Sequence, residues 1–260
     1  MSLKNTGASI NRAEKVTCVF VHGWAMNSAV WENCFNLLPD WIDVIQVDLP
    51  GHGSMADVKA ESVNDYVQAL AALVNRPVIW VGWSLGGLAL LQLARHYPER
   101  IAGLFMVAST PCFVQQDDWS YAVEKKVFDL FADSLEKDVD ATIKRFLALQ
   151  VKGSGVAMST VRELQQSLQQ RGRPSIEALK CGLNILASTD LRVELPYLNC
   201  PVSWLLGGRD TLVPVAVSGA LKSLQPNIKI IIEKQAAHAP FISHPENFAR
   251  ALIDFAEGLR

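Results

Sequence analysis

The 260-residue sequence lacks the features that mark membrane, secreted and nucleic-acid-binding proteins. No apolar run approaches the roughly 18 residues that a membrane-spanning helix needs, and residues 1–11 are too polar for a secretory signal. The formal net charge is only −2, so neither sign is in the excess that attracts nucleic acids or anionic membranes. We therefore expect a cytoplasmic, monomeric protein that binds neither nucleic acid nor membrane.

Cysteine is scarce and irregularly placed. The five cysteines are odd in number and no pair has C-x-x-C spacing, which argues against a disulfide framework and against a zinc site. The sequence also lacks H-E-x-x-H, G-x-x-x-x-G-K-[ST] and, after its first apolar run, G-x-G-x-x-G. These patterns hold zinc, nucleotide phosphates and dinucleotides, so we predict no metal ion and no cofactor. The cysteines are Cys18, Cys34, Cys112, Cys181 and Cys200.

What the sequence does contain is an alternation of short apolar runs and amphipathic stretches. Such alternation predicts an α/β protein with a mostly parallel sheet covered by helices on both faces. In such sheets, functional residues gather at the carboxyl ends of the strands. The predicted strands are residues 16–21, 44–47, 78–81, 101–108, 202–207 and 228–232, and the predicted helices are 27–38, 62–74, 88–94 and 245–259.

The alternation stops between residues 112 and 190. Four helical stretches occur there without an intervening strand, at residues 119–135, 139–151, 156–170 and 175–187. Gly153-Ser154-Gly155 and Gly172-Arg173-Pro174 provide turns between them. An insert of this size is plausible only if it is itself structured. We therefore predict a single domain over residues 1–260, with a four-helix cap inserted at 112–190.

A serine stands between a predicted strand and a predicted helix, in Gly82-Trp83-Ser84-Leu85-Gly86. This matches Gly-x-Ser-x-Gly, the pattern of a nucleophile elbow, in which the serine is exposed on a strained turn. The bare pattern also occurs by chance in ordinary glycine-rich turns. The preceding strand and the following helix favour the elbow, so Ser84 is the candidate nucleophile.

A serine nucleophile needs a base, and the base needs an orienting acid. Asp210 follows the strand at 202–207 and His238 follows the strand at 228–232, in the order Ser, Asp, His that suits this elbow. Alternatively, Asp210 only caps the following helix and His238 is a core histidine. The rival acids and base, none of which follows a predicted strand as directly, are Asp117, Asp118, Asp190 and His244.

Two backbone N–H groups are candidates for an oxyanion hole. One belongs to Leu85, which follows the serine, and the other to Trp24, in the loop His22-Gly23-Trp24 after the first strand. Gly23 allows a close approach of that backbone. The side chain of Trp24 either forms a wall of the acyl site or is part of the core.

These motifs, together with Asp48-Leu49-Pro50-Gly51-His52-Gly53, resemble the α/β-hydrolase superfamily along nearly the whole chain. A narrower resemblance, to the pimeloyl-acyl carrier protein methyl ester esterases of biotin synthesis, is carried by three stretches. These are Gly82-Trp83-Ser84-Leu85-Gly86-Gly87, Arg145-Phe146-Leu147-Ala148-Leu149-Gln150 and residues 236–245. The resemblance implies an α/β-hydrolase fold and a serine carboxylesterase that releases methanol from the carrier-linked methyl ester.

The narrower resemblance also implies substrate-binding residues in the cap. The acyl chain would contact Phe146, Leu147, Ala148, Leu149 and Gln150, although the apolar members equally suit a seal between cap and core. Residues 141–180 carry more basic than acidic side chains, which would suit an acidic carrier protein. The expected docking residues are Arg145, Lys152 and Arg162.

Three alternatives remain open from the sequence alone. The same triad would serve a broad-specificity short-acyl esterase or a C–C bond hydrolase. A hydrolase-fold binding protein that has lost catalysis is the non-enzymatic alternative, and the intact Ser84, Asp210 and His238 argue against it.

Overall fold

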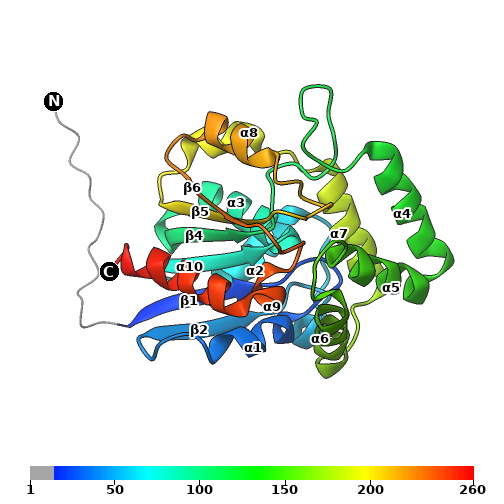
Figure 1. Cartoon of the computed structure of the whole chain (residues 1–260), viewed down its shortest axis with the longest axis horizontal. Helices are drawn as coiled ribbons and strands as arrows, with labels where there is room; N and C mark the ends of the chain where they lie inside the picture. The colour runs from blue at the N-terminus through cyan, green and yellow to red at the C-terminus, as the bar shows by residue number, and fades with distance from the viewer. Residues whose placement is uncertain (1–14) are drawn as a thin grey trace.

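The computed structural model describes residues 15–260. Its centre is a six-stranded sheet with the order β2-β1-β3-β4-β5-β6, and every neighbouring pair is parallel (Figure 1). The predicted parallel sheet is thereby confirmed. The strands are β1 (Val16–Val21), β2 (Ile42–Val47), β3 (Val78–Trp83), β4 (Ile101–Val107), β5 (Val202–Gly207) and β6 (Lys229–Glu233).

The burial of each strand explains its sequence. β1, β3 and β5 are buried along their whole length because helices cover both faces of the sheet, and they read as continuous apolar runs. The edge strand β2 mixes buried and exposed residues, and the residues of the other edge strand, β6, are half-buried or exposed. β2 begins two residues before the predicted position, because Asp43 interrupts the apolar pattern although Ile42 and Asp43 both pair with β1.

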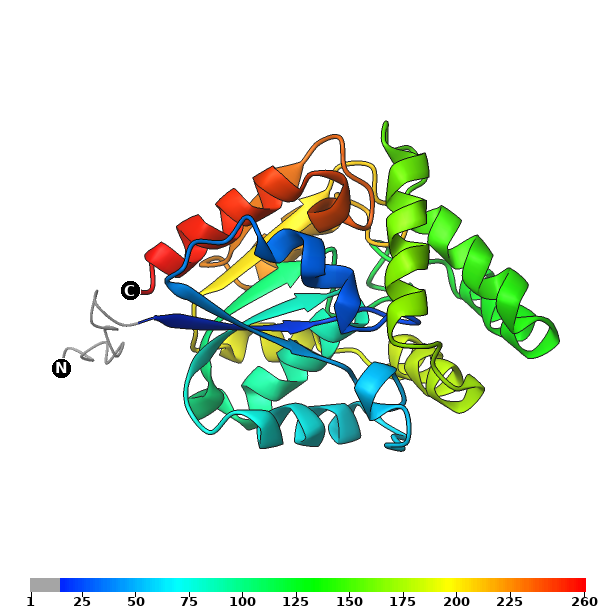
Figure 2. The same ribbon diagram turned by 90° about the horizontal axis from the view of Figure 1, so that it is seen from below.

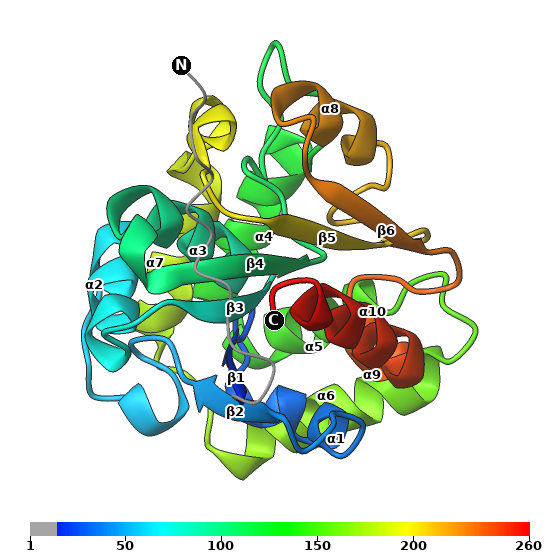
Figure 3. The same ribbon diagram turned by 90° about the vertical axis from the view of Figure 1, so that its left-hand side faces the viewer.

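Helices lie on both faces of the sheet. α1 (Glu32–Phe35), α9 (Pro240–Ser243) and α10 (Pro245–Glu257) cover one face, and α2 (Val63–Leu73) and α3 (Leu85–His96) cover the other (Figure 3). α8 (Val217–Leu224) joins β5 to β6. α2 begins at a capping box in which Ser62 and Asp65 satisfy each other's backbone N–H groups. Short 3-10 helices occupy Ser28–Trp31 (η1), Gly53–Met55 (η2), Pro98–Arg100 (η3) and Arg192–Tyr197 (η4).

The predicted helix at 27–38 is wrong. The segment forms η1 and the four-residue α1 instead. All residues of η1 are buried, and helix α6 (Ala157–Gln170) packs against it. Its apolar residues therefore reflect burial from every side, whereas the prediction assumed a helix with one apolar face.

The helices of residues 112–190 lie beyond the carboxyl ends of the strands (Figure 2). They are α4 (Lys125–Lys137), α5 (Val139–Gln150), α6 (Ala157–Gln170) and α7 (Ile176–Ser188). The first of them begins at Lys125, so the predicted start at residue 119 is wrong. Residues 112–123 form a folded loop with bridges Val114↔Val123 and Gln116↔Trp119, because buried apolar residues there serve the loop and not a helix face. A further bridge, Cys112↔Asp190, joins the two ends of the segment.

An aromatic cluster lies between the sheet and α9 and α10. Trp31 packs against Phe241 with ring centroids 4.1 Å apart, and Trp83 meets Phe241 edge-on at 5.0 Å. Phe248 stacks on Trp31 with ring centroids 5.9 Å apart and also contacts Phe241 at 6.0 Å. The cluster places Trp83, the residue before the candidate nucleophile, in a rigid setting. Within residues 15–260, no helix has both the length and the apolar character needed to cross a bilayer.

Candidate active site

Ser84 lies on a sharp turn between β3 and α3. Its backbone angles, φ 54° and ψ −118°, are strained for a residue with a side chain. The turn is held by hydrogen bonds from Ser84 N to Val107 O at 3.0 Å and from Ser109 Oγ to Ser84 O at 2.8 Å. A Cβ on Gly86 would lie 2.5 Å from the carbonyl oxygen of His22, which explains the glycine. The geometry is that of the predicted elbow.

Asp210 and His238 meet although they lie on different loops. His238 Nδ1 and Asp210 Oδ2 are 2.7 Å apart, and both side chains are buried. The other oxygen, Asp210 Oδ1, accepts hydrogen bonds from the N–H groups of Leu212 and Val213 at 2.8 and 3.0 Å. The carboxylate therefore orders its own loop and binds the imidazole, but it does not cap the following helix, since α8 begins only at Val217 and its N-cap is Ala216.

The backbone of His238 is fixed from two sides. Trp83 Nε1 donates to His238 O at 2.8 Å from the sheet side. His238 N donates to Gln150 O, at the end of α5, at 2.9 Å. The position of the imidazole therefore depends both on the sheet and on the helices of residues 112–190.

His238 Nε2 is the ring nitrogen left over for a substrate proton. It is buried and has no hydrogen-bond partner within residues 15–260. Ser84 and His238 nevertheless line the same cavity, which has a volume of about 100 Å³. The Ser84 side chain forms no hydrogen bond to the imidazole in this state, and such bonds often tighten only when substrate is bound. The structure thus brings the three predicted residues to one site, with the Asp–His contact formed and the Ser–His contact open.

The loop that carries Trp24 is held by a neutral histidine. His22 Nε2 accepts from Leu49 N at 3.0 Å, so its Nδ1 bears the proton and donates to Gly23 O at 2.8 Å. Burial lowers the pKa of His22 to about 3, and the neighbouring His52 adds to this shift. The amides of Trp24 and Leu85 donate no backbone hydrogen bond within the described chain. Leu85 N also stands at the positive end of α3.

The buried carboxylate of Asp48 holds the end of the same loop, where η1 begins. Asp48 accepts hydrogen bonds from Ser28 N at 2.6 Å and from Ser54 N and Oγ at 2.8 Å. Burial opposes its ionisation, but these hydrogen bonds outweigh burial and lower the pKa of Asp48 to about 2. Arg171, just after α6, lies 3.6 Å away and adds a positive partner. The Asp-Leu-Pro-Gly motif found in the sequence therefore has a structural role that the sequence did not reveal.

The cavity above Ser84 is apolar apart from Ser84 and His238. Trp24 lines the cavity and also belongs to the buried core, and its ring meets Phe146 edge-on at 4.7 Å. Its Nε1 donates to Leu179 O on α7 at 2.9 Å. The other lining residues are Phe113, Val123, Val127, Phe128, Phe131, Phe146, Leu149, Leu183, Leu186 and Leu212.

Only part of the predicted substrate-binding run reaches this cavity. Phe146 and Leu149 line it, as residues three apart on one helix face should. Leu147 is buried away from the lining and Ala148 is exposed to solvent. Gln150 is fully buried, and its side-chain amide has no hydrogen-bond partner within residues 15–260. Successive residues of a helix face different directions, so only two of these five residues face the cavity. The structure does not place Leu147, Ala148 or Gln150 at the cavity wall.

Sequence reasoning missed most of the wall. Val127, Phe128 and Phe131 come from α4, and Leu183 and Leu186 come from α7. Their spacing of three or four residues indicates an apolar helix face, but it does not say whether that face meets a cavity or the core. Phe113 and Val123 come from the 112–123 loop, where a helix was predicted in part.

The three predicted docking residues are all exposed. Arg145, Lys152 and Arg162 form no ion pair within the described part of the chain. Other basic residues nearby are paired, Arg171 with Glu32, Arg173 with Asp140 and Lys180 with Glu136. Among residues 15–260, no group of histidine, cysteine, aspartate and glutamate side chains is arranged to hold a metal ion.

Comparison with known proteins shows the family of the chain. The model of the alpha/beta hydrolase family matches residues 18–251. The chain is 41% identical to the pimeloyl-[acyl-carrier protein] methyl ester esterase of Vibrio cholerae serotype O1, over 92% of this chain and 93% of that protein. It is 40% identical to the enzyme of the same name from Xanthomonas oryzae pv. oryzae, over 91% and 93%.

A solved structure shows the same fold. The esterase from Exiguobacterium antarcticum superposes with a TM-score of 0.84 over 94% of this chain and 92% of that one, at 18% identity. The predicted α/β-hydrolase fold is therefore confirmed. With the family model matching most of its length and its relatives about 40% identical, this chain belongs to the alpha/beta hydrolase family and, within it, to the pimeloyl-[acyl-carrier protein] methyl ester esterases.

Proposed function

We propose that this protein is a serine carboxylesterase that hydrolyses the methyl ester of pimeloyl-acyl carrier protein, acting as a cytoplasmic monomer in biotin synthesis. The observation that carries the proposal is the joint position of Ser84 and the Asp210–His238 pair at one apolar cavity. Membership of the esterase family supports the substrate.

The proposed reaction begins with attack by Ser84 Oγ on the ester carbonyl carbon. His238 Nε2 takes the serine proton, and Asp210 holds the imidazole through Nδ1 and stabilises the imidazolium. The N–H groups of Trp24 and Leu85 hold the oxyanion of the tetrahedral intermediate. As the intermediate collapses, His238 gives its proton to the departing methoxide and methanol leaves.

The second half releases the acid. His238 takes a proton from water, the hydroxide attacks the acyl carbon, and the bond to Ser84 Oγ breaks as His238 returns the proton to the serine. The product is the free carboxylate of the carrier-linked acyl chain. The apolar wall formed by Phe146 and Leu149 suits a methylene chain, and it excludes water from the site.

The direct test is hydrolysis of purified pimeloyl-carrier methyl ester, followed as methanol release and as the mass of the carrier-linked product. The wild type should release methanol and Ser84→Ala should not. Turnover of a p-nitrophenyl ester or a vinylogous diketone with no turnover of the carrier substrate would assign a different hydrolase activity. Restoring growth without biotin to a strain lacking this esterase tests the same point in cells.

We propose Arg145, Lys152 and Arg162 as the docking residues for the acidic carrier protein. They are exposed and form no ion pair with any of residues 15–260, so their charges are available to the carrier protein. The variant Arg145→Glu/Arg162→Glu should raise KM for the carrier-linked ester and leave turnover of p-nitrophenyl butyrate unchanged. Lys229→Glu, an exposed charge reversal on the edge strand β6, is the matched control and should affect neither substrate. An equal KM in the double variant and the control would contradict this assignment.

A further inference from the structure

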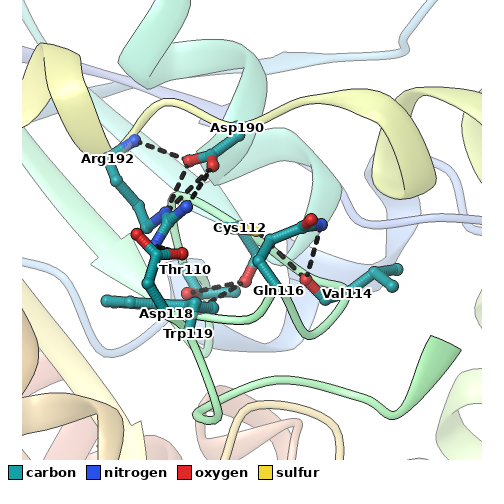
Figure 4. A network of polar contacts seen from close by, with 8 residues as sticks. All are labelled: Thr110, Cys112, Val114, Gln116, Asp118, Trp119, Asp190 and Arg192. Carbon is teal, nitrogen blue, oxygen red and sulfur yellow. Dashed lines mark hydrogen bonds and ion pairs between the residues drawn. The ribbon is translucent and has the colours of Figure 1, made fainter.

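A polar network lies where the helical segment 112–190 meets the sheet domain, apart from the proposed catalytic residues (Figure 4). At its centre is Arg192, the first residue of η4, whose side chain is only 16% exposed. Its Nε and Nη2 donate to the Asp190 carboxylate at 2.7–2.9 Å. Its Nη1 donates to Asp118 at 2.8 Å, and the guanidinium lies 5.3 Å from the centroid of the Trp119 ring.

The contacts of Arg192 reach the 112–123 loop at its tip. Asp118 and Trp119 form that tip, and Trp119 Nε1 donates to Cys112 O at the base of the loop, at 3.1 Å. Gln116 and Trp119 exchange two backbone hydrogen bonds, which close the turn between them. In Figure 4, Asp118 and Trp119 both lie next to the guanidinium of Arg192. Arg192 therefore links the loop to residues 189–191, the segment that follows α7.

The same loop supplies part of the acyl cavity. Phe113 and Val123 both line it, and Val123 N donates to Phe113 O at 3.0 Å. These two residues sit at the open end of the loop, while Asp118 and Trp119 sit at its closed end. A displacement of Asp118 or Trp119 should therefore also displace Phe113 and Val123 in the cavity wall, because the loop that connects them is short and hydrogen-bonded.

We propose that Arg192 is a positioning residue that fixes the 112–123 loop and so sets the acyl-length preference of the cavity. The proposal rests on the proposed esterase function. Only arginine suits the position, because its planar fork binds Asp190 in two places, reaches Asp118 with a third N–H group and still stacks on Trp119. Lysine would keep the charge and lose this geometry. Isolated exposed ion pairs contribute little, but this one is shared among several partners and partly buried.

The test compares kcat and KM for p-nitrophenyl butyrate and p-nitrophenyl octanoate in Arg192→Gln and Arg192→Lys. Without the network the loop should loosen and the cavity widen on its Phe113 side. We expect the octanoate-to-butyrate ratio of kcat/KM to rise about threefold or more in Arg192→Gln, mainly through KM, while kcat for butyrate stays within about twofold. Amide hydrogen exchange in residues 112–123 should become faster in the same variant.

Two further variants keep the test decisive. Asp118→Asn removes only the contact at the loop tip; Asp118 is 76% exposed, so this variant should fold and show a smaller shift in the same direction. Arg95→Gln is the matched control, since it breaks an ion pair with Glu194 on the same short helix η4 without touching the loop. It should keep the wild-type ratio.

Unchanged ratios in Arg192→Gln and Asp118→Asn, with normal turnover, would overturn the positioning role alone. If Arg192→Gln fails to fold, the ratio in Asp118→Asn decides. A wild type that hydrolyses neither p-nitrophenyl ester and does not react with a fluorophosphonate probe would contradict the proposed esterase function itself, and the positioning role with it.

Discussion

The sheet domain and the helical segment 112–190 contribute to the site in different ways. On the sheet domain, positions next to the proposed catalytic groups make contacts that suit only one type of residue. Gly86 fits because a side chain would strike a carbonyl, and His22 fits because it donates and accepts at fixed atoms. In the helical segment, the wall residues Phe131, Phe146 and Leu186 need only be apolar and face inward.

This difference separates the proposed chemistry from the selection of substrate. The sheet domain supplies the proposed nucleophile, base, acid and oxyanion donors, whereas the helices supply most of the apolar wall. At the site itself, hydrogen bonds from His238 N to Gln150 O and from Trp24 Nε1 to Leu179 O join the parts. Changes in the first part should therefore abolish activity, and changes in the second should redistribute it among substrates.

The largest effect should come from Ser84. Replacing it by alanine removes the proposed nucleophile, so kcat should fall roughly 10⁴–10⁶-fold. The melting temperature of the variant should stay close to that of the wild type, because the backbone strain is unchanged and the Ser84 hydroxyl forms no hydrogen bond within the described residues. Turnover of p-nitrophenyl butyrate, thermal unfolding and labelling by a fluorophosphonate probe measure these outcomes. An active, folded Ser84→Ala protein would remove the basis of the proposed mechanism.

The second-largest effect should come from Gly182, where the helical segment contacts Trp24 of the sheet domain. A Cβ on Gly182, in α7, would lie 2.6 Å from Trp24 Cδ1. Gly182→Ala should therefore displace the tryptophan and the proposed oxyanion donor with it, lowering kcat/KM about tenfold, since one displaced donor costs several kcal/mol at most. Gly219→Ala, in α8, is the control, because nothing lies within 4 Å of that Cβ. Equal activity in both variants would show that the helices do not position the oxyanion loop.

The same contrast explains what the sequence could predict. The elbow, the Asp210 and His238 loops and the parallel sheet follow from short motifs and apolar runs, because backbone geometry there dictates residue type. The cavity wall does not, since Val127 and Leu183 look like any apolar helix face. The 27–38 segment was mispredicted because packing from every side produces an apolar pattern without a regular helix. The support from Asp48 and Arg192 needs contacts between distant segments, which one sequence does not reveal.

Acid should destabilise the sheet domain, because burial of His22 and His52 disfavours their charged forms. Burial lowers the pKa values of His22 and His52 below their ordinary value of 6.5, and residues 112–190 contain no histidine. The unfolded chain therefore binds more protons as pH falls below 6.5, and the free energy of unfolding should decrease. Each histidine contributes up to about 1.4 kcal/mol per pH unit.

His52→Asn should make this decline shallower, measured by urea unfolding between about pH 4.5 and 6.5. Asp48 does not interfere in this window. Its pKa is lowered to about 2, so its contribution to stability is complete above the ordinary value of 3.8 and is lost only as pH falls from there toward 2. A slope equal to that of the wild type would show that His52 charges without unfolding the protein.

The smallest effect should separate two adjacent residues of α5. Leu149 lines the cavity and Ala148 faces solvent, although the family resemblance implies substrate contact for both. Leu149→Ala should raise KM for p-nitrophenyl octanoate about threefold by removing apolar contact area, with little change in kcat. Ala148→Gln keeps a good helix former on an exposed face and should leave KM unchanged. If Ala148→Gln raises KM as much as Leu149→Ala does, substrate reaches the outer face of α5, and the helical segment acts as more than an inner wall.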